Sequence, residues 1–411
     1  MKINTLRQWL LLPLTLFSLV LFTCATWAAE NPRLSAKAGK QMAAVFALYE
    51  QEKLSQALLQ LNEVKARSSF DKAYVQRFKG NLYWQLGNEK KAIEALQIAL
   101  SENALGQTEH RESQRMLADL YLNQAQTLRA IVLYKELIAQ AESESLYQHL
   151  ALAYYQQKSW QALIEASNKA LALGTTFNKN LHLLQLNAFY ALENYAAANK
   201  ILFKLSETYP QDKRWWMQLA ANYQRLKQDK KALATYELAN LKGFITGSSE
   251  IQNLATLRAM SGAPYQAASL LESAVNEGLV AANAEVYKHL AMFWQAARES
   301  DKAQFYWGKS ASLSGNAQHR LIQAQLLRLS GNYEKVLSAL DKINSDDIKI
   351  KGKVALTKIE TLFALKEYAQ AEHVARLALT YPGAEKRAAS WLKILANKRQ
   401  EKQRLKKLSQ R

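Results

Sequence analysis

Histidine, cysteine and carboxylate side chains most often carry catalysis or bind metals, but their spacing in this sequence favours neither. The chain has 411 residues, and its six histidines are scattered at positions 110, 149, 182, 289, 319 and 373. No two of them have the spacing of zinc ligands, and the only cysteine is Cys24. No glycine-rich phosphate loop and no Gly-x-Ser-x-Gly nucleophile motif occurs. We therefore expect no enzyme activity, no metal and no cofactor.

An apolar N-terminal segment follows two basic residues. Lys2 and Arg7 precede an uncharged, largely apolar run over residues 9–22, and small residues follow up to Ala28. This is the layout of a secretory signal peptide, and the apolar run is too short for a typical membrane span. We therefore expect residues 1–28 to be removed on export, which places the mature chain in the periplasm of a Gram-negative bacterium.

Cys24 raises the alternative of a lipid anchor. The residue before it is Thr23, whereas a bacterial lipoprotein signal usually has Gly, Ala or Ser at that place. Plain cleavage is therefore favoured over lipid attachment at Cys24. With a single cysteine in the whole sequence, the chain can form no internal disulfide.

The chain is strongly basic, with a net charge of +19, or +17 without Lys2 and Arg7. In an exported protein this excess favours anionic membrane surfaces, acidic proteins or cell-wall polymers as partners, and not nucleic acid. Residues 383–411 hold ten Lys or Arg and two Glu. Three interpretations of this tail are open: a helical extension that keeps the chain end soluble, contact with anionic lipid or cell wall, and contact with an acidic protein. Its basic residues include Lys398, Arg399, Lys402, Arg404, Lys406 and Lys407.

A pattern recurs about every 34 residues along the chain. In most copies a residue that is usually Ala, here called the anchor, is followed four residues later by a large apolar one. The composition is rich in Ala, Leu, Gln, Lys and Glu and poor in Gly and Pro, which favours helices throughout. The ten anchors are Ala57, Ala92, Ala130, Leu163, Ala198, Ala232, Ala267, Ala303, Val336 and Ala371.

Residue types at fixed distances before each anchor also recur from copy to copy. Nine residues earlier the side chain is large and apolar or aromatic in nine of ten copies, Arg258 being the exception, and twelve residues earlier it is often Gly or Ala. Two antiparallel helices approach closely where one offers a small residue and the other a large one, so each copy predicts a helix pair. His149 and His289 lie at equivalent points of two copies, where we expect histidines that pack between helices.

The clearest copy runs from Gly80 to Leu100, with Tyr83, Gly87 and Ala92 in between. It resembles the tetratricopeptide repeat, whose pattern is a small residue, an aromatic, a turn glycine and then Ala, a large residue and Ala. The resemblance covers residues 36–382 and implies an all-α, right-handed superhelical α-solenoid of about ten helix pairs. We expect the array over residues 29–382 and a capping helix with the basic tail over residues 383–411. The apolar face of that helix is predicted to comprise Trp391, Leu392, Ile394 and Leu395.

The resemblance also implies where a partner binds. Tetratricopeptide proteins usually bind peptides on the inner, concave surface formed by the first helix of each pair. A groove of mixed polar, aromatic and basic residues suits an extended or helical peptide. The alternative is an ordinary solvated face, with the partner bound elsewhere. The implied contact residues are Arg77, Asn81, Trp84, Arg115, Asp119, Tyr155, Asn187, Tyr190, Arg214, Met217 and Lys288.

These observations favour an exported scaffold that gathers protein partners in an envelope process. Residues 69–84 are similar to repeat proteins encoded beside TonB-type energy-transduction components. That narrower resemblance implies a complex like that of TonB, ExbB and ExbD as partner, in outer-membrane transport. The alternative function is a component of cell-surface polysaccharide assembly or export, whose groove binds a synthase or the polymer itself.

Overall fold

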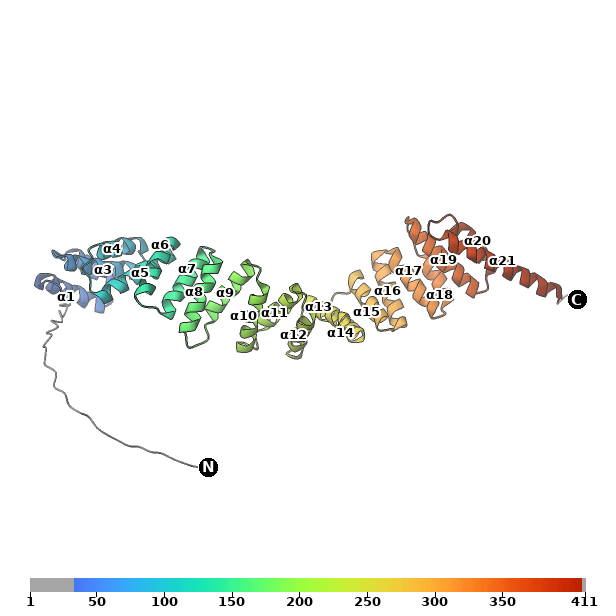
Figure 1. The fold of residues 1–411 in the computed structure, drawn as a ribbon, viewed down its shortest axis with the longest axis horizontal. Helices are drawn as coiled ribbons and strands as arrows, with labels where there is room; N and C mark the ends of the chain where they lie inside the picture. Colours follow the sequence, from blue (N-terminus) through green and yellow to red (C-terminus); the bar gives the residue numbers. More distant parts are fainter. Residues whose placement is uncertain (1–32, 409–411) are drawn as a thin grey trace, which may run out of the picture. The chain divides into compact units, whose positions relative to one another are not determined.

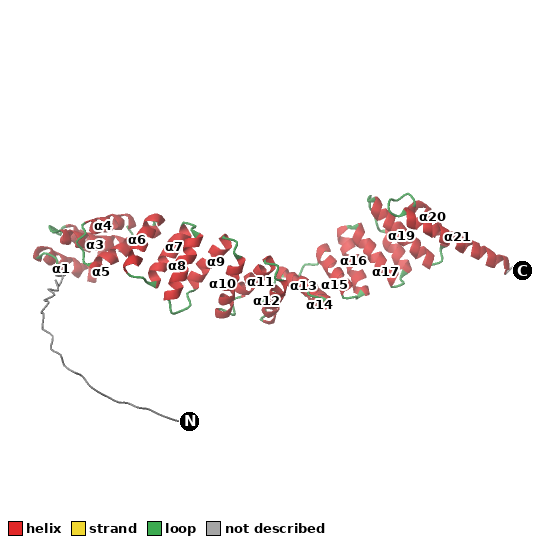
Figure 2. Ribbon diagram, in the orientation of Figure 1, coloured by secondary structure: helices red, strands yellow, loops and turns green. Residues whose placement is uncertain are grey.

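The computed structural model describes residues 33–408, with side chains up to residue 405, and every regular element in that range is a helix (Figure 2). The predicted signal peptide, its cleavage site and Cys24 lie outside the described residues. The chain divides into two compact units, unit 1 up to Thr176 and unit 2 from Phe177 onwards. None of the helices in the described range is long and apolar enough to cross a membrane.

Unit 1 contains four helix pairs in its described part (Figure 1). The two helices of each pair pack against each other, and the second helix of one pair packs against the first of the next. The helices are α1 (Ala36–Glu50), α2 (Leu54–Asn62), α3 (Ser69–Gln85), α4 (Glu89–Ser101), α5 (Gln107–Asn123), α6 (Thr127–Gln140), α7 (Glu144–Gln156) and α8 (Trp160–Leu173).

Unit 2 continues the pattern with six further pairs and a final helix. The same alternation of contacts within and between pairs holds through this unit. Its helices are α9 (Lys179–Ala191), α10 (Tyr195–Thr208), α11 (Lys213–Arg225), α12 (Asp229–Leu241), α13 (Ser248–Met260), α14 (Pro264–Asn276), α15 (Ala284–Ala296), α16 (Ser300–Ser314), α17 (Ala317–Leu329), α18 (Tyr333–Asp341), α19 (Ile348–Ala364), α20 (Tyr368–Ala378) and α21 (Glu385–Leu408). The predicted all-α repeat fold is thus confirmed.

The anchors predicted from the sequence are the most buried feature of the array. All ten lie in second helices, and each has a relative exposure of 0%. The large residues four positions later are buried with them, as for Leu96 and Tyr134, and so are the small residues twelve positions earlier, as for Ala118. Each pair therefore closes on a contact between a small residue and a large one, and this close approach is what the recurring pattern encodes.

Each turn inside a pair has the same backbone conformation. The residue five positions before every anchor has a positive φ, beginning with Glu52 in the first pair and ending with Lys366 in the last. The next amide N–H donates to the carbonyl nine positions before the anchor, as from Asn88 to Tyr83 at 2.8 Å and from Ser159 to Tyr154 at 2.9 Å. This is the Schellman helix ending, which satisfies carbonyls that the helix leaves free. It sets the direction in which the second helix returns.

Arg258 departs from the pattern, since it takes the place of the large apolar residue nine positions before Ala267. Its guanidinium donates two hydrogen bonds to Glu237, at 2.7 and 2.8 Å, and the arginine side chain is 19% exposed. The exception is therefore compensated by a bidentate ion pair from the preceding helix α12, whose geometry suits arginine and not lysine.

The last helix closes the apolar end of unit 2 and then extends beyond it. Leu395 is buried, and Trp391 and Leu392 pack partly buried against α19 and α20. Ile394, which we expected on the same face, is 42% exposed, so the apolar face is narrower than predicted. No residue from 396 to 405 is buried.

The buried carboxylate of Asp71 fastens α1 to α3. Its two oxygens accept hydrogen bonds from the Ser35 amide (2.9 Å) and the Ser35 hydroxyl (2.7 Å), just before α1 begins. Burial alone would raise the pKa of this carboxyl, but the hydrogen bonds from Ser35 and Ser68 outweigh it and hold the pKa below its ordinary value of 3.8. The repeat pattern gave no sign of this contact, because it joins residues 36 positions apart.

The shared turn conformation predicts opposite effects of two substitutions. Lys158 and Gly87 occupy the same positive-φ position, with φ values of 58° and 76°. A non-glycine residue at a positive φ costs roughly 1–2 kcal/mol of folding free energy relative to glycine. The greater conformational freedom of glycine in the unfolded chain partly offsets this difference. Lys158→Gly should raise the free energy of unfolding of unit 1 by about 0.5–1 kcal/mol, and Gly87→Ala should lower it by about 1 kcal/mol. Urea titration followed by circular dichroism measures both, and a loss of stability in Lys158→Gly would contradict the account.

The Asp71 contact predicts a pH-dependent contribution to the stability of the first pair. Because the pKa of Asp71 is lowered on folding, its stabilisation is present above pH 3.8 and is lost as the pH falls further. At pH 7, Asp71→Asn should lower the local opening free energy of α1 by about 1–2 kcal/mol, because an amide cannot accept both hydrogen bonds. Native-state hydrogen exchange of α1 measures this.

The exposed Asp229 supplies the control for that experiment, since Asp229→Asn should leave α1 unchanged. The difference between wild type and Asp71→Asn should shrink below pH 3.8. Equal protection of α1 in both proteins at pH 7 would show that the contact contributes nothing.

Candidate partner-binding groove

The contact residues implied by the sequence all lie on first helices, but they fall into two sets. The set in unit 1 lies on α3, α5 and α7, and the set in unit 2 lies on α9, α11 and α15. We call the side chains that α3, α5 and α7 present on the predicted inner side the first-helix face of unit 1. The unit 1 set is Arg77, Asn81, Trp84, Arg115, Asp119 and Tyr155, and the unit 2 set is Asn187, Tyr190, Arg214, Met217 and Lys288.

Polar bridges join successive first helices of unit 1. Arg77 on α3 donates to the Glu112 carboxylate on α5 at 2.6 Å, and Arg115 on α5 donates to the Ser145 hydroxyl on α7 at 2.7 Å. Arg77 and Arg115 occupy the same place in their repeats, fifteen residues before the anchor, so the two bridges are equivalent. The first-helix face therefore presents arginines whose direction is fixed by the next repeat.

Asp119 contacts side chains of the two helices that follow it, α6 and α7. It accepts a 2.6 Å hydrogen bond from the Tyr134 hydroxyl of α6, and its oxygen lies 3.9 Å from His149 Nε2 of α7. The His149 Nδ1–H donates to the Ser145 carbonyl at 2.7 Å, and the ring lies 5.8 Å from the Tyr134 ring. Burial, the hydrogen bond to Asp119 and the negative charge of Asp119 raise the pKa of Tyr134, so the phenol stays neutral and remains a donor. His149 thus packs between helices, as we expected.

A hollow of about 270 Å³ opens between α3 and α5. Its lining combines aromatic, leucine and methionine side chains with polar groups, and the exposed Arg77–Glu112 pair marks its mouth. We call this cavity the α3–α5 hollow. It is lined by Tyr74, Arg77, Phe78, Asn81, Leu96, Glu112, Ser113 and Met116.

Two aromatic side chains of the first-helix face are open to solvent. Trp84 is 50% exposed and Tyr155 is 36% exposed, and they occupy the same place in their repeats. Asn81 accepts a hydrogen bond from Gln85, which also donates to the Tyr49 hydroxyl of α1 at 2.8 Å. Half-exposed aromatics beside fixed polar groups are typical of surfaces that bind other proteins.

The residues implied in unit 2 are held in separate local contacts. Arg214 forms a bidentate pair with Asp212 just before α11, and the Tyr190 hydroxyl accepts a hydrogen bond from Asn222 at 3.1 Å. Met217 is partly buried, packed on the cluster around Tyr236, and Asn187 is exposed. In the described part of the chain, these residues share no hydrogen bond or ion pair that would join them into one site.

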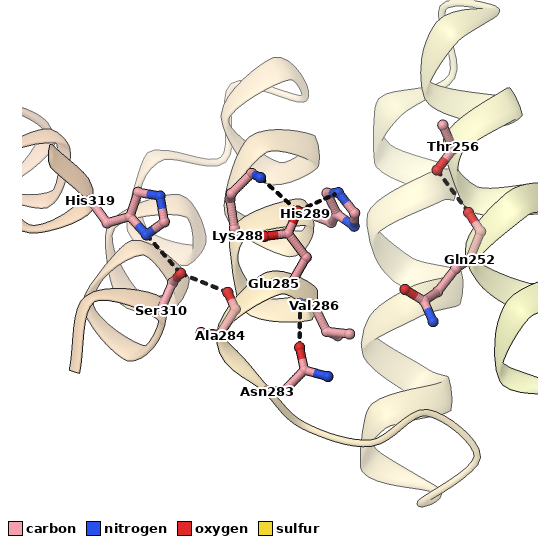
Figure 3. A network of polar contacts seen from close by, with 10 residues as sticks. All are labelled: Gln252, Thr256, Asn283, Ala284, Glu285, Val286, Lys288, His289, Ser310 and His319. Carbon is pink, nitrogen blue, oxygen red and sulfur yellow. Dashed lines mark hydrogen bonds and ion pairs between the residues drawn. The ribbon is translucent and has the colours of Figure 1, made fainter. Parts of the chain in front are cut away.

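Lys288 belongs to a polar network on α15 to α17 (Figure 3). It donates to Glu285 at 2.6 Å, and His289 Nε2 lies 3.4 Å from the same oxygen. The Ser310 hydroxyl donates its one proton to the Ala284 carbonyl at 2.7 Å, so the contact of 3.0 Å with His319 requires Nδ1–H of the histidine as donor. Burial, and then the charge of Lys288, lower the pKa of His319. The network links three helices: His319 joins α17 to α16, whereas His289 contacts Glu285 and Phe293 of its own helix α15.

Trp215 and Trp216 lie next to each other on α11. Trp215 is buried, and the Trp216 N–H donates to the Pro210 carbonyl at 3.2 Å. The described residues include no group of three or more histidine, cysteine, aspartate or glutamate side chains that could hold a metal ion.

The basic tail is part of α21 as far as the structure describes it. Arg399 lies 3.6 Å from Glu372 of α20, and Lys398 donates to Glu401 at 2.7 Å. Lys402 and Arg404 are exposed. The side chains of Lys406 and Lys407 lie outside the described set.

Sequence reasoning missed Glu112, which fixes Arg77, and the hollow beside it. Both features join residues about 35 positions apart in successive repeats, so no local pattern marks them. The signal that could have found the hollow is a change of residue type at three equivalent positions, where Leu96, Met116 and Asn81 stand in place of Tyr134, His149 and Asp119.

Comparison with known proteins gives structural similarity only. No protein-family model matches this sequence, and no curated protein matches it. A tetratricopeptide repeat protein from Parabacteroides merdae is 17% identical, with 72% of this chain and 99% of that chain covered and a TM-score of 0.37. The C-terminal part of a TPR repeat-containing protein from Cytophaga hutchinsonii is 16% identical, covering 67% and 97%, with a TM-score of 0.38.

A third solved structure is YrrB, described as a TPR protein with an unusual peptide-binding site. It is 15% identical, covers 46% of this chain and 96% of its own, and has a TM-score of 0.38. At these values the similarity carries no argument about function. The described chain is an all-helical array of repeated helix pairs, and the solved structures to which it is similar are tetratricopeptide repeat proteins.

Proposed function

We propose that this protein is an exported scaffold that binds a protein segment along the first-helix face of unit 1. The observation that carries the proposal is the α3–α5 hollow, which opens in the first-helix face that also carries the half-exposed Trp84. A partner segment lying there would meet a cavity of mixed apolar and polar lining, an exposed ring and polar groups of fixed direction. Such a combination provides both contact area and orientation.

The chemistry of the face favours the middle of a polypeptide over its C-terminal carboxylate. The guanidinium of Arg77 already pairs with Glu112, and that of Arg115 donates to Ser145, so neither is reserved for an incoming anion. The Asn81 side chain accepts from Gln85 through its oxygen, which leaves its N–H₂ group directed at other acceptors. Amide groups of this kind suit the carbonyl oxygens of an extended peptide.

The location and the identity of the partner belong to the same proposal. The predicted signal peptide supports a periplasmic site of action, and the similarity of residues 69–84 to TonB-associated repeat proteins supports a complex of the TonB, ExbB and ExbD kind as partner. The basic tail would add peripheral contact with an anionic membrane or cell wall. No part of the proposal requires catalysis or nucleic acid.

A second candidate is the assembly or export of a cell-surface polysaccharide. The exposed rings of Trp84 and Tyr155 favour it, because aromatic faces can stack on sugar rings. This alternative predicts that sugar or polysaccharide machinery, and not an energy-transducing complex, accompanies the protein.

A crosslinked pull-down from the native envelope tests the proposal. The tagged protein should enrich an inner-membrane energy-transducing complex, and Arg77→Ala with Asn81→Ala should reduce that enrichment at least tenfold, as expected if a central contact of about 1.4 kcal/mol or more is lost. Arg77 is partly exposed in a surface ion pair, so the double variant should keep its fold.

The matched control is Lys91→Ala with Glu94→Ala, two exposed residues of α4, the second helix of the same pair. This variant should bind like the wild type. Enrichment of polysaccharide machinery, or equal loss in both double variants, would contradict the proposed groove.

A further inference from the structure

The place of the α3–α5 hollow recurs in each neighbouring repeat, and there it is filled by an aromatic ring. Between α1 and α3, Phe46 and Phe78 meet edge to face at 5.1 Å on the cluster that contains Leu61. Leu61 and Leu96 are both four residues after an anchor. The first inter-repeat space of unit 1 therefore holds two rings above its leucine.

The space on the other side of the hollow is also filled. Between α5 and α7 the residue four positions after the anchor is Tyr134, which is fully buried. Its hydroxyl reaches Asp119, and its ring lies against His149. In unit 2, Trp307 also lies four residues after its anchor Ala303 and is buried, and its N–H donates to Gln295 of the first helix α15 at 2.9 Å.

Between α3 and α5 the equivalent positions carry smaller side chains. Leu96 stands where Tyr134 does, Met116 stands where His149 does, and Asn81 stands where Asp119 does. A Cβ at Gly80 would lie only 2.7 Å from Leu96 Cγ, so Leu96 packs down against α3 and away from the mouth of the hollow. The ring that fills this space on both sides is therefore absent here, and a cavity of about 270 Å³ remains.

We propose that the α3–α5 hollow binds an aromatic, apolar side chain of the partner segment, of the phenylalanine class. This inference rests on the proposed function and specifies the partner's chemistry. The walls suit a ring: Phe78 and Tyr74 offer edge-to-face contacts, and the Met116 thioether packs well on aromatic edges. The cavity is smaller than the usual range for drug-sized ligands, which fits a single side chain.

The polar mouth completes the site. The exposed Arg77–Glu112 pair and Asn81 line it, whereas the buried lining residues are Leu96 and Ser113 and the partly buried ones include Phe78 and Met116. A ring that enters from the mouth would contact Phe78, Leu96 and Met116, and the backbone of its residue would lie at the polar groups.

Methyl NMR of the full chain with small probes tests the site without the partner. The probe is N-acetyl-phenylalaninamide, and the signal is the Met116 methyl resonance, which a bound ring should shift by its ring current. We expect saturable binding with a Kd of roughly millimolar, as usual for a ligand of this size. N-acetyl-leucinamide should bind more weakly, N-acetyl-lysinamide should not shift Met116, and the Met292 methyl of unit 2 should not respond to any probe.

Substitution of Leu96 supplies the variants. Leu96→Tyr introduces the residue that the next repeat has as Tyr134, and its ring should fill the hollow. Probe binding should then weaken at least tenfold, while the helix content and the thermal transition are retained. Leu96→Met conserves volume and should bind the probe like the wild type. No shift of Met116 up to the solubility limit, an equal shift in Leu96→Tyr, or tighter binding of the leucine probe would overturn the inference.

Failure of this inference can be distinguished from failure of the proposed scaffold function. If wild type and Leu96→Tyr capture the same partner equally well, the hollow is not the recognition site although the scaffold stands. If the probe binds as expected but no envelope protein is captured, the hollow binds aromatic groups and the scaffold function is wrong.

Discussion

Close approach of two helices at a small, buried residue is the constraint on which the rest of the structure depends. All ten anchors are fully buried, and the turn before each one contains a residue in the left-handed region, closed by the same hydrogen bond to the carbonyl nine positions before the anchor. The anchor allows the helices to touch, and the turn directs the second helix back onto the first. Because each pair is too small to be stable alone, the array accumulates stability from contacts between neighbours.

The same constraint decides where a partner can bind. Second helices supply the anchors and their large companions, so these residues are committed to the interior. First helices bury one side in their pair and leave another free, and in unit 1 this free side carries the Arg77–Glu112 and Arg115–Ser145 bridges, the exposed Trp84 and the α3–α5 hollow. The hollow lies where Leu96, Met116 and Asn81 stand in the places of Tyr134, His149 and Asp119 of the next repeat. A regular scaffold thus acquires a specific cavity through changes of side chain at several equivalent positions.

The sequence predicted the helix pairs well, because the contact that forms them repeats at a fixed spacing. It indicates the turns only in part: glycine stands at three of them, Gly87, Gly262 and Gly331, but Lys158 and Glu193 adopt the same positive φ and give no sign of it. The tertiary context imposes that conformation on any residue type. The extent of the capping face was wrong at Ile394, because this residue lies at the edge of the helical arc formed by Trp391, Leu392 and Leu395 and is 42% exposed.

The candidate groove was predicted less completely than the fold. The repeat pattern alone was enough to place Arg77, Asn81 and Trp84 on first helices. The pairing of Arg77 with Glu112 and the burial of Asp71, in contrast, depend on residues far away in the sequence. Cavities are harder still, because they result from the sizes of several side chains at once and not from any one residue. The implied residues of unit 2, such as Arg214 and Lys288, are each engaged with a nearby carboxylate, which local sequence could have suggested.

Site-specific photocrosslinking in the native envelope tests the central claim most directly. A photoreactive phenylalanine analogue is placed at position 84, on the first-helix face, or at position 98, where Ile98 is exposed on the second helix α4 of the same pair. If the first-helix face of unit 1 binds a protein segment, irradiation should yield a discrete protein adduct from position 84 and none from position 98. Adducts from position 98 alone, or no protein adduct from position 84, would contradict the account.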